Sequence, residues 1–303
     1  MERLININQD TLDELDNYLS LPKPPGLILQ GVPGLGKEQA AKYAAGRLLN
    51  CSPGDLPQNP DYYETAAADP LKVEDMELLI EKSRRCSIGG RKLFLVNQAH
   101  SITRRAQNRL LKLLEDRAET NILILISEEN RLLDTIKSRC YMVSFHPLNE
   151  KDMKQYLTGC NIRNEYLDFT CYLTENAPFS FSSRKKEVED YISCYQQICK
   201  ITMREDLLFI LHTIKEKSDS DFYTIHADNP KWNIRLLLYP FYKYTLNRCA
   251  GCREKNHFPD AFYSRKQAMK ILLHGMEHLS MAQMSYTKND YFNLIRFIIE
   301  VNG

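Results

Sequence analysis

A glycine-rich run that ends in a lysine has the clearest chemical character in this sequence. It reads Gly31-Val32-Pro33-Gly34-Leu35-Gly36-Lys37 and fits the first seven positions of the phosphate-binding pattern G-x-x-x-x-G-K-[ST]. Glycines at this spacing let consecutive backbone N–H groups converge on phosphate oxygens at the positive end of a helix. We therefore expect Gly31, Gly34, Gly36 and Lys37 to form a P-loop; the alternative is a glycine-rich turn without a ligand.

Two positions that should hold Mg²⁺ beside such a loop carry the wrong side chains. Glu38 follows the lysine, where a P-loop needs a hydroxyl group. A carboxylate at this place repels triphosphate oxygens. Asn97 and Gln98 follow a later apolar strand, where an Asp should complete the metal site. We predict that the chain does not hydrolyse ATP and binds no cofactor productively; the alternative is that Glu38 itself binds Mg²⁺.

The elements around these residues alternate between short apolar strands and amphipathic helices. The expected strands span 27–29, 93–96, 122–126 and 141–145, and the expected helices span 11–19, 37–49, 73–85, 103–115 and 131–137. Thr103 is the expected N-cap of the helix 103–115. Continuous apolar strands between helices predict a parallel sheet that is covered on both faces.

Beyond His146-Pro147 the pattern indicates helices only. They are expected at 150–157, 165–173, 184–198, 206–215, 233–246, 264–279 and 289–301. The sequence therefore predicts an α/β domain over 1–147, a small helical domain over 148–201 and a helical domain over 202–303.

Composition narrows the class of protein. Of the 303 residues, 43% are hydrophobic and 26% are charged, as in ordinary globular domains. The net charge of +1 argues against a protein that grips DNA alone by many phosphate contacts. The nine cysteines are scattered and odd in number, which indicates reduced thiols, and no apolar leader is visible. We expect a cytoplasmic protein.

Several further segments together resemble a known family. They read Asp61-Tyr62-Tyr63-Glu64, Arg91-Lys92-Leu93-Phe94-Leu95-Val96-Asn97-Gln98-Ala99-His100, Ala106-Gln107-Asn108-Arg109-Leu110-Leu111-Lys112-Leu113-Leu114-Glu115 and Thr135-Ile136-Lys137-Ser138-Arg139-Cys140. In this order they resemble bacterial clamp-loader subunits of DNA polymerase III, of the delta-prime and gamma/tau types. The resemblance covers residues 1–146 well, and the helical remainder agrees in length and class.

The resemblance implies a RecA-like AAA+ domain, a helical lid and a helical collar that mediates oligomerisation. It implies a five-subunit ring with gamma/tau and delta, which opens the sliding clamp and places it on primer-template DNA. Glu38 and Asn97 favour delta-prime, the member that typically lacks ATPase activity, so ATP and Mg²⁺ would belong to neighbouring subunits of the polymerase holoenzyme. An active ATPase of the same fold and a binding module outside replication are the alternatives.

Ser138 and Arg139 are the sharpest site residues that the resemblance implies. It places this motif at the ATP of the neighbouring subunit, where Arg139 would act as an arginine finger. A planar, permanently charged guanidinium suits that role because it binds phosphate oxygens in two places. The alternative is a solvated arginine that pairs with Glu128 or Asp134. Ser127 ends a strand where a nucleotide sensor would stand, and we expect it to be a cap.

Four cations cluster around the end of the second expected amphipathic helix: Lys82, Arg84, Arg85 and Arg91. The resemblance suggests that this side of the fold lines a DNA channel, and backbone contacts without base readout suit these side chains. A solvated helix end whose cations complement the helix dipole is the other interpretation.

We expect no metal site. The family often carries a four-cysteine zinc module after its first helix, but Cys51 is the only cysteine between Lys37 and Tyr62. Cys249, Cys252 and His257 lack a fourth ligand at suitable spacing. The lid of the family carries a small-residue sensor motif, of which 176–180 is at best a remnant.

Overall fold

The structure is a computed structural model that describes residues 8–65, 73–115, 120–128, 130–199, 230–249, 263–281 and 297–298. The chain divides into two compact units. The first comprises Met1–Met153 with Ala177–Ser180, and the second comprises Lys154–Asn176 with Phe181–Gly303. The first unit thus takes in ten residues of the expected lid, 148–153 and 177–180, while the domain limits at 147 and 201 stay predictions.

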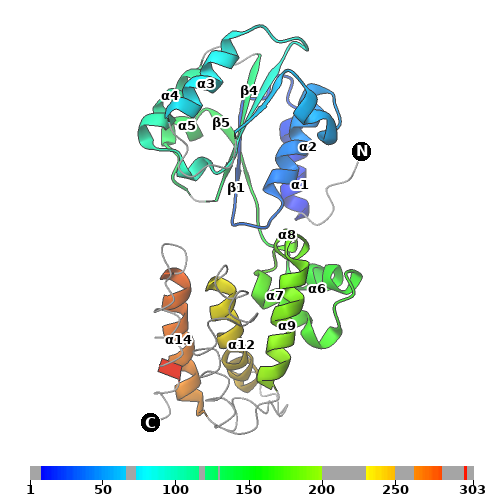
Figure 1. Ribbon diagram of the computed structural model, residues 1–303, viewed down its shortest axis with the longest axis vertical. Coiled ribbons are helices and arrows are strands. Elements are labelled where there is room, and N and C mark those ends of the chain that lie inside the picture. Colours follow the sequence, from blue (N-terminus) through cyan, green and yellow to red (C-terminus); the bar gives the residue numbers. More distant parts are fainter. Residues whose placement is uncertain are drawn as a thin grey trace, which may run out of the picture. The chain divides into compact units, whose positions relative to one another are not determined.

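A five-stranded parallel sheet forms the centre of the first unit (Figure 1). Its order is β2 (Tyr62–Glu64), β3 (Lys92–Val96), β4 (Asn121–Ser127), β1 (Gly26–Gln30) and β5 (Cys140–Ser144). In the central register Leu27 lies beside Ile124 of β4 and beside Tyr141 of β5. The predicted parallel sheet is confirmed, and β2 is a fifth strand that the sequence analysis did not find.

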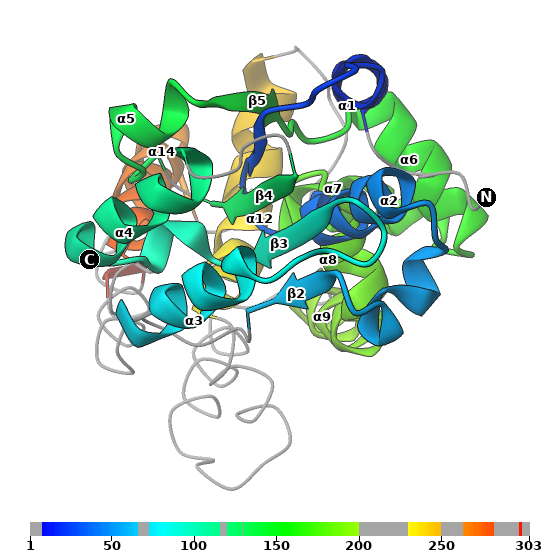
Figure 2. The same ribbon diagram turned by 90° about the horizontal axis from the view of Figure 1, so that it is seen from above.

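Helices cover both faces of this sheet (Figures 1 and 2). One face carries α1 (Gln9–Leu19) and α2 (Lys37–Leu49), and the other carries α3 (Val73–Arg84), α4 (Arg104–Glu115) and α5 (Asp134–Lys137). Strand side chains alternate between the two cores, so that Leu93 and Leu95 pack on the side of α2 while Phe94 and Val96 pack on the side of α4.

The start of α4 confirms the expected cap. The backbone N–H of Ala106 donates to Thr103 Oγ1 at 3.3 Å, and the N–H of Gln107 donates to the Thr103 carbonyl at 2.9 Å. These bonds satisfy N–H groups that a helix start leaves without an intrahelical partner. The Thr103 hydroxyl thereby fixes where α4 begins.

Helices make up the described part of the second unit. They are α6 (Glu150–Gly159), α7 (Leu167–Thr174), α8 (Pro178–Ser183), α9 (Lys185–Cys199), α12 (Pro230–Cys249) and α14 (Arg265–Met281), of which α6 and α8 begin in the first unit. Within the second unit α12 packs against α7, α9 and α14. The expected helix 206–215 lies outside the described residues, as do Cys252 and His257 and all but 297–298 of the expected helix 289–301.

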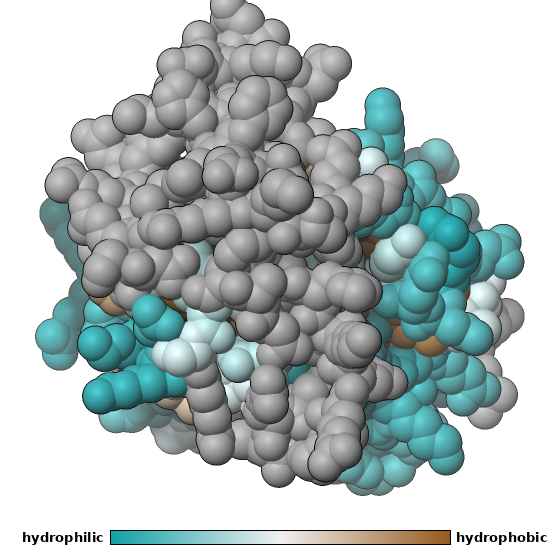
Figure 3. Space-filling model, turned by 90° about the horizontal axis from the view of Figure 1, so that it is seen from below, coloured by the Kyte–Doolittle hydropathy of each residue, from teal (hydrophilic) through white to brown (hydrophobic). Residues whose placement is uncertain are grey.

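On the face drawn in Figure 3 the coloured surface is mainly hydrophilic, with small apolar areas between teal side chains. Within the described ranges, no helix combines the length and the apolarity that a membrane span needs.

Candidate functional site

The glycine-rich run adopts the expected strand–loop–helix arrangement. It leaves β1 at Gln30 and enters α2 at Lys37, and the Gly31 N–H donates to the Ser127 carbonyl at the end of β4 at 3.2 Å. Gly34 and Gly36 have φ values of 77° and 85°, in the left-handed region that favours glycine. The local backbone is therefore that of a P-loop, at the carboxyl edge of the sheet where such loops bind phosphates.

Lys37 is held by the loop itself. Its side chain is buried, with 5% of the residue exposed, and its ammonium group donates to the carbonyls of Gly31 and Val32, both at 2.6 Å. Burial lowers the pKa of Lys37 to about 8, against a smaller opposing effect of Glu128. Two short bonds to carbonyl oxygens thus replace the phosphate oxygens that a P-loop lysine binds in this family of folds.

Residues Ala177–Ser180, which we call the cover segment, pack directly on the P-loop. Ala177 is 1% exposed within the core cluster of α1 and α2, and the Phe179 N–H donates to the Gly34 carbonyl at 3.0 Å. A Cβ atom at Gly34 would lie 1.8 Å from Ser180 Oγ, and one at Gly36 would lie 2.4 Å from a Phe179 ring carbon. The cover segment thus uses the space above both glycines.

A charged cluster links α2 to the ends of β2 and β3. Lys42 Nζ lies 2.7 Å from Glu38 Oε1 and 3.8 Å from Glu64 Oε1, and the hydrogen bond to Glu38 is the main cause that raises the pKa of Lys42. Glu64 also accepts from the Tyr62 hydroxyl at 2.8 Å and from Asn97 Nδ2 at 2.9 Å. Sequence reasoning missed Glu64, although strands of a parallel sheet end at one edge and β2 ends beside β3.

This cluster is a poor site for Mg²⁺ bound to a triphosphate. Position 38 offers a carboxylate that is already paired with Lys42, and position 97 offers an amide that is bonded to Glu64 and to the Thr65 carbonyl. A P-loop site instead uses a hydroxyl and an aspartate to hold the ion. The side chains present therefore do not fit the metal that nucleotide hydrolysis requires.

Arg139 follows α5 and its side chain is 42% exposed. Its Nη1 donates to the Thr135 carbonyl at 2.9 Å, and its Nη2 lies 2.9 Å from Glu115 Oε1 at the end of α4. Ser138 Oγ donates to the same Thr135 carbonyl at 3.2 Å. The ion pair that the sequence analysis considered with Glu128 or Asp134 is thus replaced by one with Glu115.

Gln107 fixes the position of the segment that carries Arg139, and sequence reasoning did not single it out. It is buried in α4, and its Nε2 donates to the carbonyls of Ile102 at 3.1 Å and Arg131 at 3.3 Å. Its Oε1 accepts from the Leu133 N–H at 2.8 Å, directly before α5. A buried amide with three backbone partners orients a loop strongly, because each broken bond leaves a buried polar group unsatisfied.

Of the four predicted DNA-contact cations, Lys82 and Arg84 lie in the last turn of α3, Arg85 follows that helix, and Arg91 directly precedes β3. Lys82 Nζ lies 4.6 Å from the centre of the Tyr63 ring, and Arg85 Nη2 lies 2.9 Å from Glu81 Oε1. Arg91 Nη2 donates to the Pro22 carbonyl at 3.3 Å, whereas Arg84 is exposed. Part of the charge of these cations is therefore engaged within the chain, and their contact with DNA stays a prediction.

A second basic surface, on α4, was missed by sequence reasoning. Arg104, Arg105 and Lys112 are exposed on this helix, and none of them forms an ion pair among the residues that the structure describes. The signal was present in the sequence, because side chains at 104, 108 and 112 share one face of a helix.

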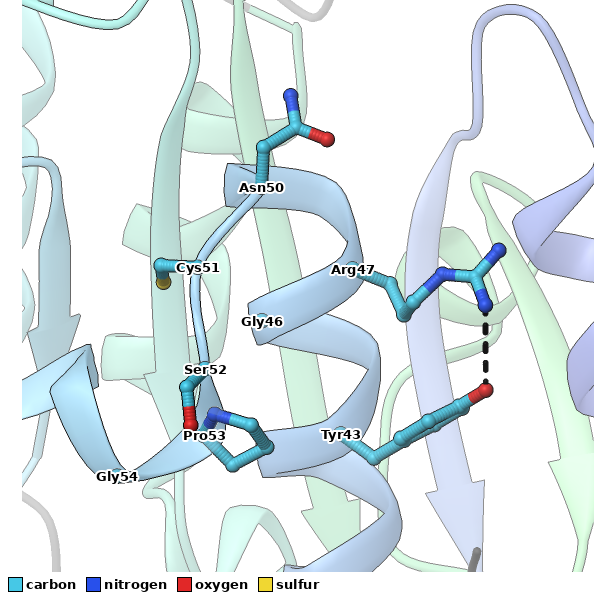
Figure 4. A pocket seen from close by; sticks show the side chains of 8 residues that line it. All are labelled: Tyr43, Gly46, Arg47, Asn50, Cys51, Ser52, Pro53 and Gly54. Carbon is cyan, nitrogen blue, oxygen red and sulfur yellow. Dashed lines mark hydrogen bonds between the residues drawn. The ribbon is translucent and has the colours of Figure 1, made fainter. Parts of the chain in front are cut away.

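A surface pocket of about 760 Å³ lies at the other end of α2 from the P-loop (Figure 4). Tyr43 and Arg47 project from α2 toward each other, with Arg47 Nη1 donating to the Tyr43 hydroxyl at 3.4 Å. Cys51, in the loop that follows α2, also lines the pocket. The P-loop leads into the first turn of α2, whereas the pocket lies beside the later turns of this helix. The pocket is therefore not part of the candidate nucleotide site.

Comparison with known proteins places this site in a family. Residues 24–149 match the family model described as DNA polymerase III, delta subunit. The chain is 33% identical to DNA polymerase III subunit gamma of Buchnera aphidicola over 138 residues, which cover 39% of this chain and 36% of that protein. It is also 33% identical to the delta′ subunits of Pseudomonas aeruginosa and Escherichia coli, over 37% and 41% of this chain and 40% and 43% of those proteins.

A solved structure extends the fold comparison over the whole chain. The gamma-subunit-related protein of Thermotoga maritima aligns with 97% of this chain and 100% of its own, with a TM-score of 0.55 and 14% identity. That likeness concerns the fold alone. The sequence matches span less than half the length of these relatives, and the family model includes the P-loop. Through residues 24–149, this chain is thus similar to the delta′ and gamma subunits of the DNA polymerase III clamp-loader family.

Proposed function

We propose that this chain is a delta′-type clamp-loader subunit that does not hydrolyse ATP and that completes the ATP site of a neighbouring subunit. Its partners are the gamma/tau and delta subunits, the sliding clamp and primer-template DNA. The observation that carries the proposal is the closed P-loop, in which Lys37 bonds to its own loop and Phe179 and Ser180 occupy the space above Gly34 and Gly36.

Two features of the site support the loss of hydrolysis. Nucleotide would have to displace the cover segment and pull the buried Lys37 ammonium from two 2.6 Å bonds. Once bound, it would meet Glu38 and Asn97 in place of the usual Mg²⁺ ligands. Each step costs free energy, so the fold is retained as architecture while the chemistry takes place elsewhere.

The second candidate is an active gamma-like ATPase, which the 33% identity to a gamma subunit favours. Steady-state ATP hydrolysis by the isolated chain separates the two. We expect no turnover above that of a Lys37→Ala control. Hydrolysis that Lys37→Ala abolished would establish the gamma-like function and contradict our proposal.

Arg139 is the residue that we propose to act in trans. It is exposed at the surface, and its guanidinium is chemically suited to the phosphate oxygens of a neighbour's ATP. Arginines in this role raise the rate on the order of 10³–10⁵-fold where they act. In a loader reconstituted with gamma/tau and delta, Arg139→Ala should leave assembly intact and abolish the contribution of the adjacent ATP site to turnover.

Arg163→Ala is the matched control, because Arg163 is another exposed arginine in an ion pair, with Glu165 at 3.0 Å. Loaders that contain this variant should hydrolyse ATP at the unmodified rate. If Arg139→Ala loaders assemble and turn over ATP as fast as the Arg163→Ala loaders, the trans role of Arg139 is refuted.

A further inference from the structure

Both ends of the Arg139 guanidinium are bound within its own chain. Nη1 donates to the Thr135 carbonyl and Nη2 contacts Glu115 Oε1, each at 2.9 Å. A guanidinium binds phosphate bidentately through two such N–H groups. In this conformation two of the five N–H donors of Arg139, one on each Nη atom, are engaged within the chain, so a phosphate must compete with Glu115 for the charge and for the position of the fork.

The backbone around Arg139 is fixed by its hydrogen bonds, so a change of conformation at this position involves the side chain. The Arg139 N–H donates to the Ile136 carbonyl at 3.1 Å, and the next residue, Cys140, begins β5. On the other side of the ion pair, α4 and the start of α5 are joined through the buried Gln107. Glu115 and the Arg139 backbone thus stand at a set separation, while both side chains reach into solvent, with 52% and 42% of their area exposed.

The ion pair with Glu115 is the interaction that an anion would replace. A backbone carbonyl is neutral, so Thr135 gives Arg139 a direction without cancelling its charge, whereas the Glu115 carboxylate cancels it. Exposed ion pairs of this kind are worth little, on the order of a two- to fivefold bias between the paired and the free state. Such a bias is small enough for a multiply charged phosphate to overcome and large enough to measure.

We propose that Glu115 is a positioning residue that holds Arg139 in a withdrawn conformation until the phosphates of a neighbouring nucleotide displace it. This inference rests on the proposed trans role of Arg139 and adds its regulation. The paired state reduces the fraction of subunits that are competent to act, and the apparent efficiency of the adjacent site falls by that same fraction. Glu115 thereby keeps Arg139 paired within its own chain until a nucleotide is bound at the adjacent site.

The test is kcat/KM for ATP in the reconstituted loader that carries Glu115→Gln. This change removes the charge and keeps the size of the side chain, and the exposed position tolerates it. We expect kcat/KM to rise about two- to fivefold at low ionic strength, and the gain to shrink as salt screens the ion pair of the unmodified protein. Glu115→Asp, which keeps the carboxylate on a shorter side chain, should fall between the two.

The matched control is Glu165→Gln, because Glu165 is 57% exposed in a 3.0 Å pair with Arg163, close to the 52% and 2.9 Å of Glu115. It should leave kcat/KM unchanged. In an Arg139→Ala loader, Glu115→Gln should have no effect, since the partner is gone.

The outcomes separate the inference from the function on which it rests. An unchanged or lowered kcat/KM with Glu115→Gln overturns the inference, and so does a gain that persists without Arg139. If Arg139→Ala itself leaves the turnover intact, the proposed trans role fails, whatever Glu115 does.

Discussion

Lys37 joins two properties at the residue scale that rarely coexist, a cationic side chain and burial. Water is removed from its ammonium group, and two carbonyl oxygens at 2.6 Å take the place of that water. Because neutral carbonyls stabilise the charge less than water and anions do, the pKa falls to about 8. The lysine is thus a structural part of the loop, and its charge costs stability at neutral pH.

The pKa of Lys37 predicts how stability depends on pH. Its pKa is about 8 in the folded chain and 10.5 in the unfolded chain, so between these values the unfolded state binds more protons. The contribution of Lys37 to the free energy of unfolding should therefore rise with pH through this window, by on the order of 1.5 kcal/mol between pH 8 and about pH 9.5. Below pH 8 the full penalty is present and the dependence on Lys37 is lost.

Chemical denaturation at several pH values measures this slope. Lys37→Met should lower this slope, whereas Lys112→Met, at an exposed position on α4, should keep it. Burial raises the pKa of Cys140 and Cys194 to about 12 and also raises the pKa of Tyr18 and Tyr62, so loss of these protons in the unfolded state lowers stability from about pH 9 upward. Because the unmodified protein and Lys37→Met share this loss, the difference between their slopes gives the contribution of Lys37. Equal slopes for the unmodified protein and Lys37→Met would contradict the burial argument.

Among the elements, closure of the P-loop depends on two segments together, the loop itself and the cover segment that packs on it. Gly34 and Gly36 are needed twice, once for their positive φ values and once because Phe179 and Ser180 approach their Cα atoms. In a nucleotide-binding loop the second need comes from the phosphates. Here a segment from 146 residues along the chain, counting from Gly34 to Ser180, supplies it.

This double need gives a prediction for Gly34→Ala. Left-handed backbone costs a residue with a Cβ about 1–2 kcal/mol, and forcing the Cβ against Ser180 should add about 1–3 kcal/mol. Gly90→Ala is the matched control, since Gly90 has a similar φ of 85° and nothing within 4 Å of the Cβ position. The free energies of unfolding of both variants, from denaturant titration, give the difference.

Ser180→Gly should restore part of the loss in Gly34→Ala, because it removes the two side-chain atoms nearest to the added methyl group. The Ser180 backbone N, at 2.9 Å from the Cβ position, stays in the way, so the rescue should be incomplete. If Gly34→Ala costs no more than Gly90→Ala, the cover segment does not rest on the P-loop as described.

For the molecule as a whole, net charge limits the contact with DNA that we propose. A net charge of +1 leaves little long-range attraction, so contact depends on local surfaces such as the α3 end and the exposed face of α4. Both surfaces present arginines, and both belong to the first unit. Backbone contact with a duplex inside a ring of subunits requires no more than this.

Charge reversal tests the α3 surface in the assembled loader. Arg84→Glu with Arg85→Glu should weaken binding to primer-template DNA and lower the slope of log K against log salt by about one to two. Lys185→Glu with Lys186→Glu, the same change on exposed residues of α9, is the control. Equal slopes for the two variants would leave the α3 cluster as a solvated helix end and favour Arg104 and Arg105 on α4.

Features that depend on neighbours along the chain were predictable from the residues alone. Apolar strands between amphipathic helices predicted the parallel sheet, the glycines and Lys37 predicted the loop between β1 and α2, and Thr103 predicted the start of α4. These features follow from local periodicity and from backbone preferences, which a short window contains. The three-residue strand β2 escaped because a run that short carries no periodicity.

Which of these residues contact one another became clear only from the three-dimensional packing of the elements. The bonds of Phe179 to Gly34, of Asn97 to Glu64 and of Glu115 to Arg139 join positions that are distant in sequence. Nothing in a window around either partner specifies them, because they arise when separate elements pack around one sheet. The fold class was therefore predictable from the sequence. The closed loop and the paired arginine, in contrast, result from tertiary packing.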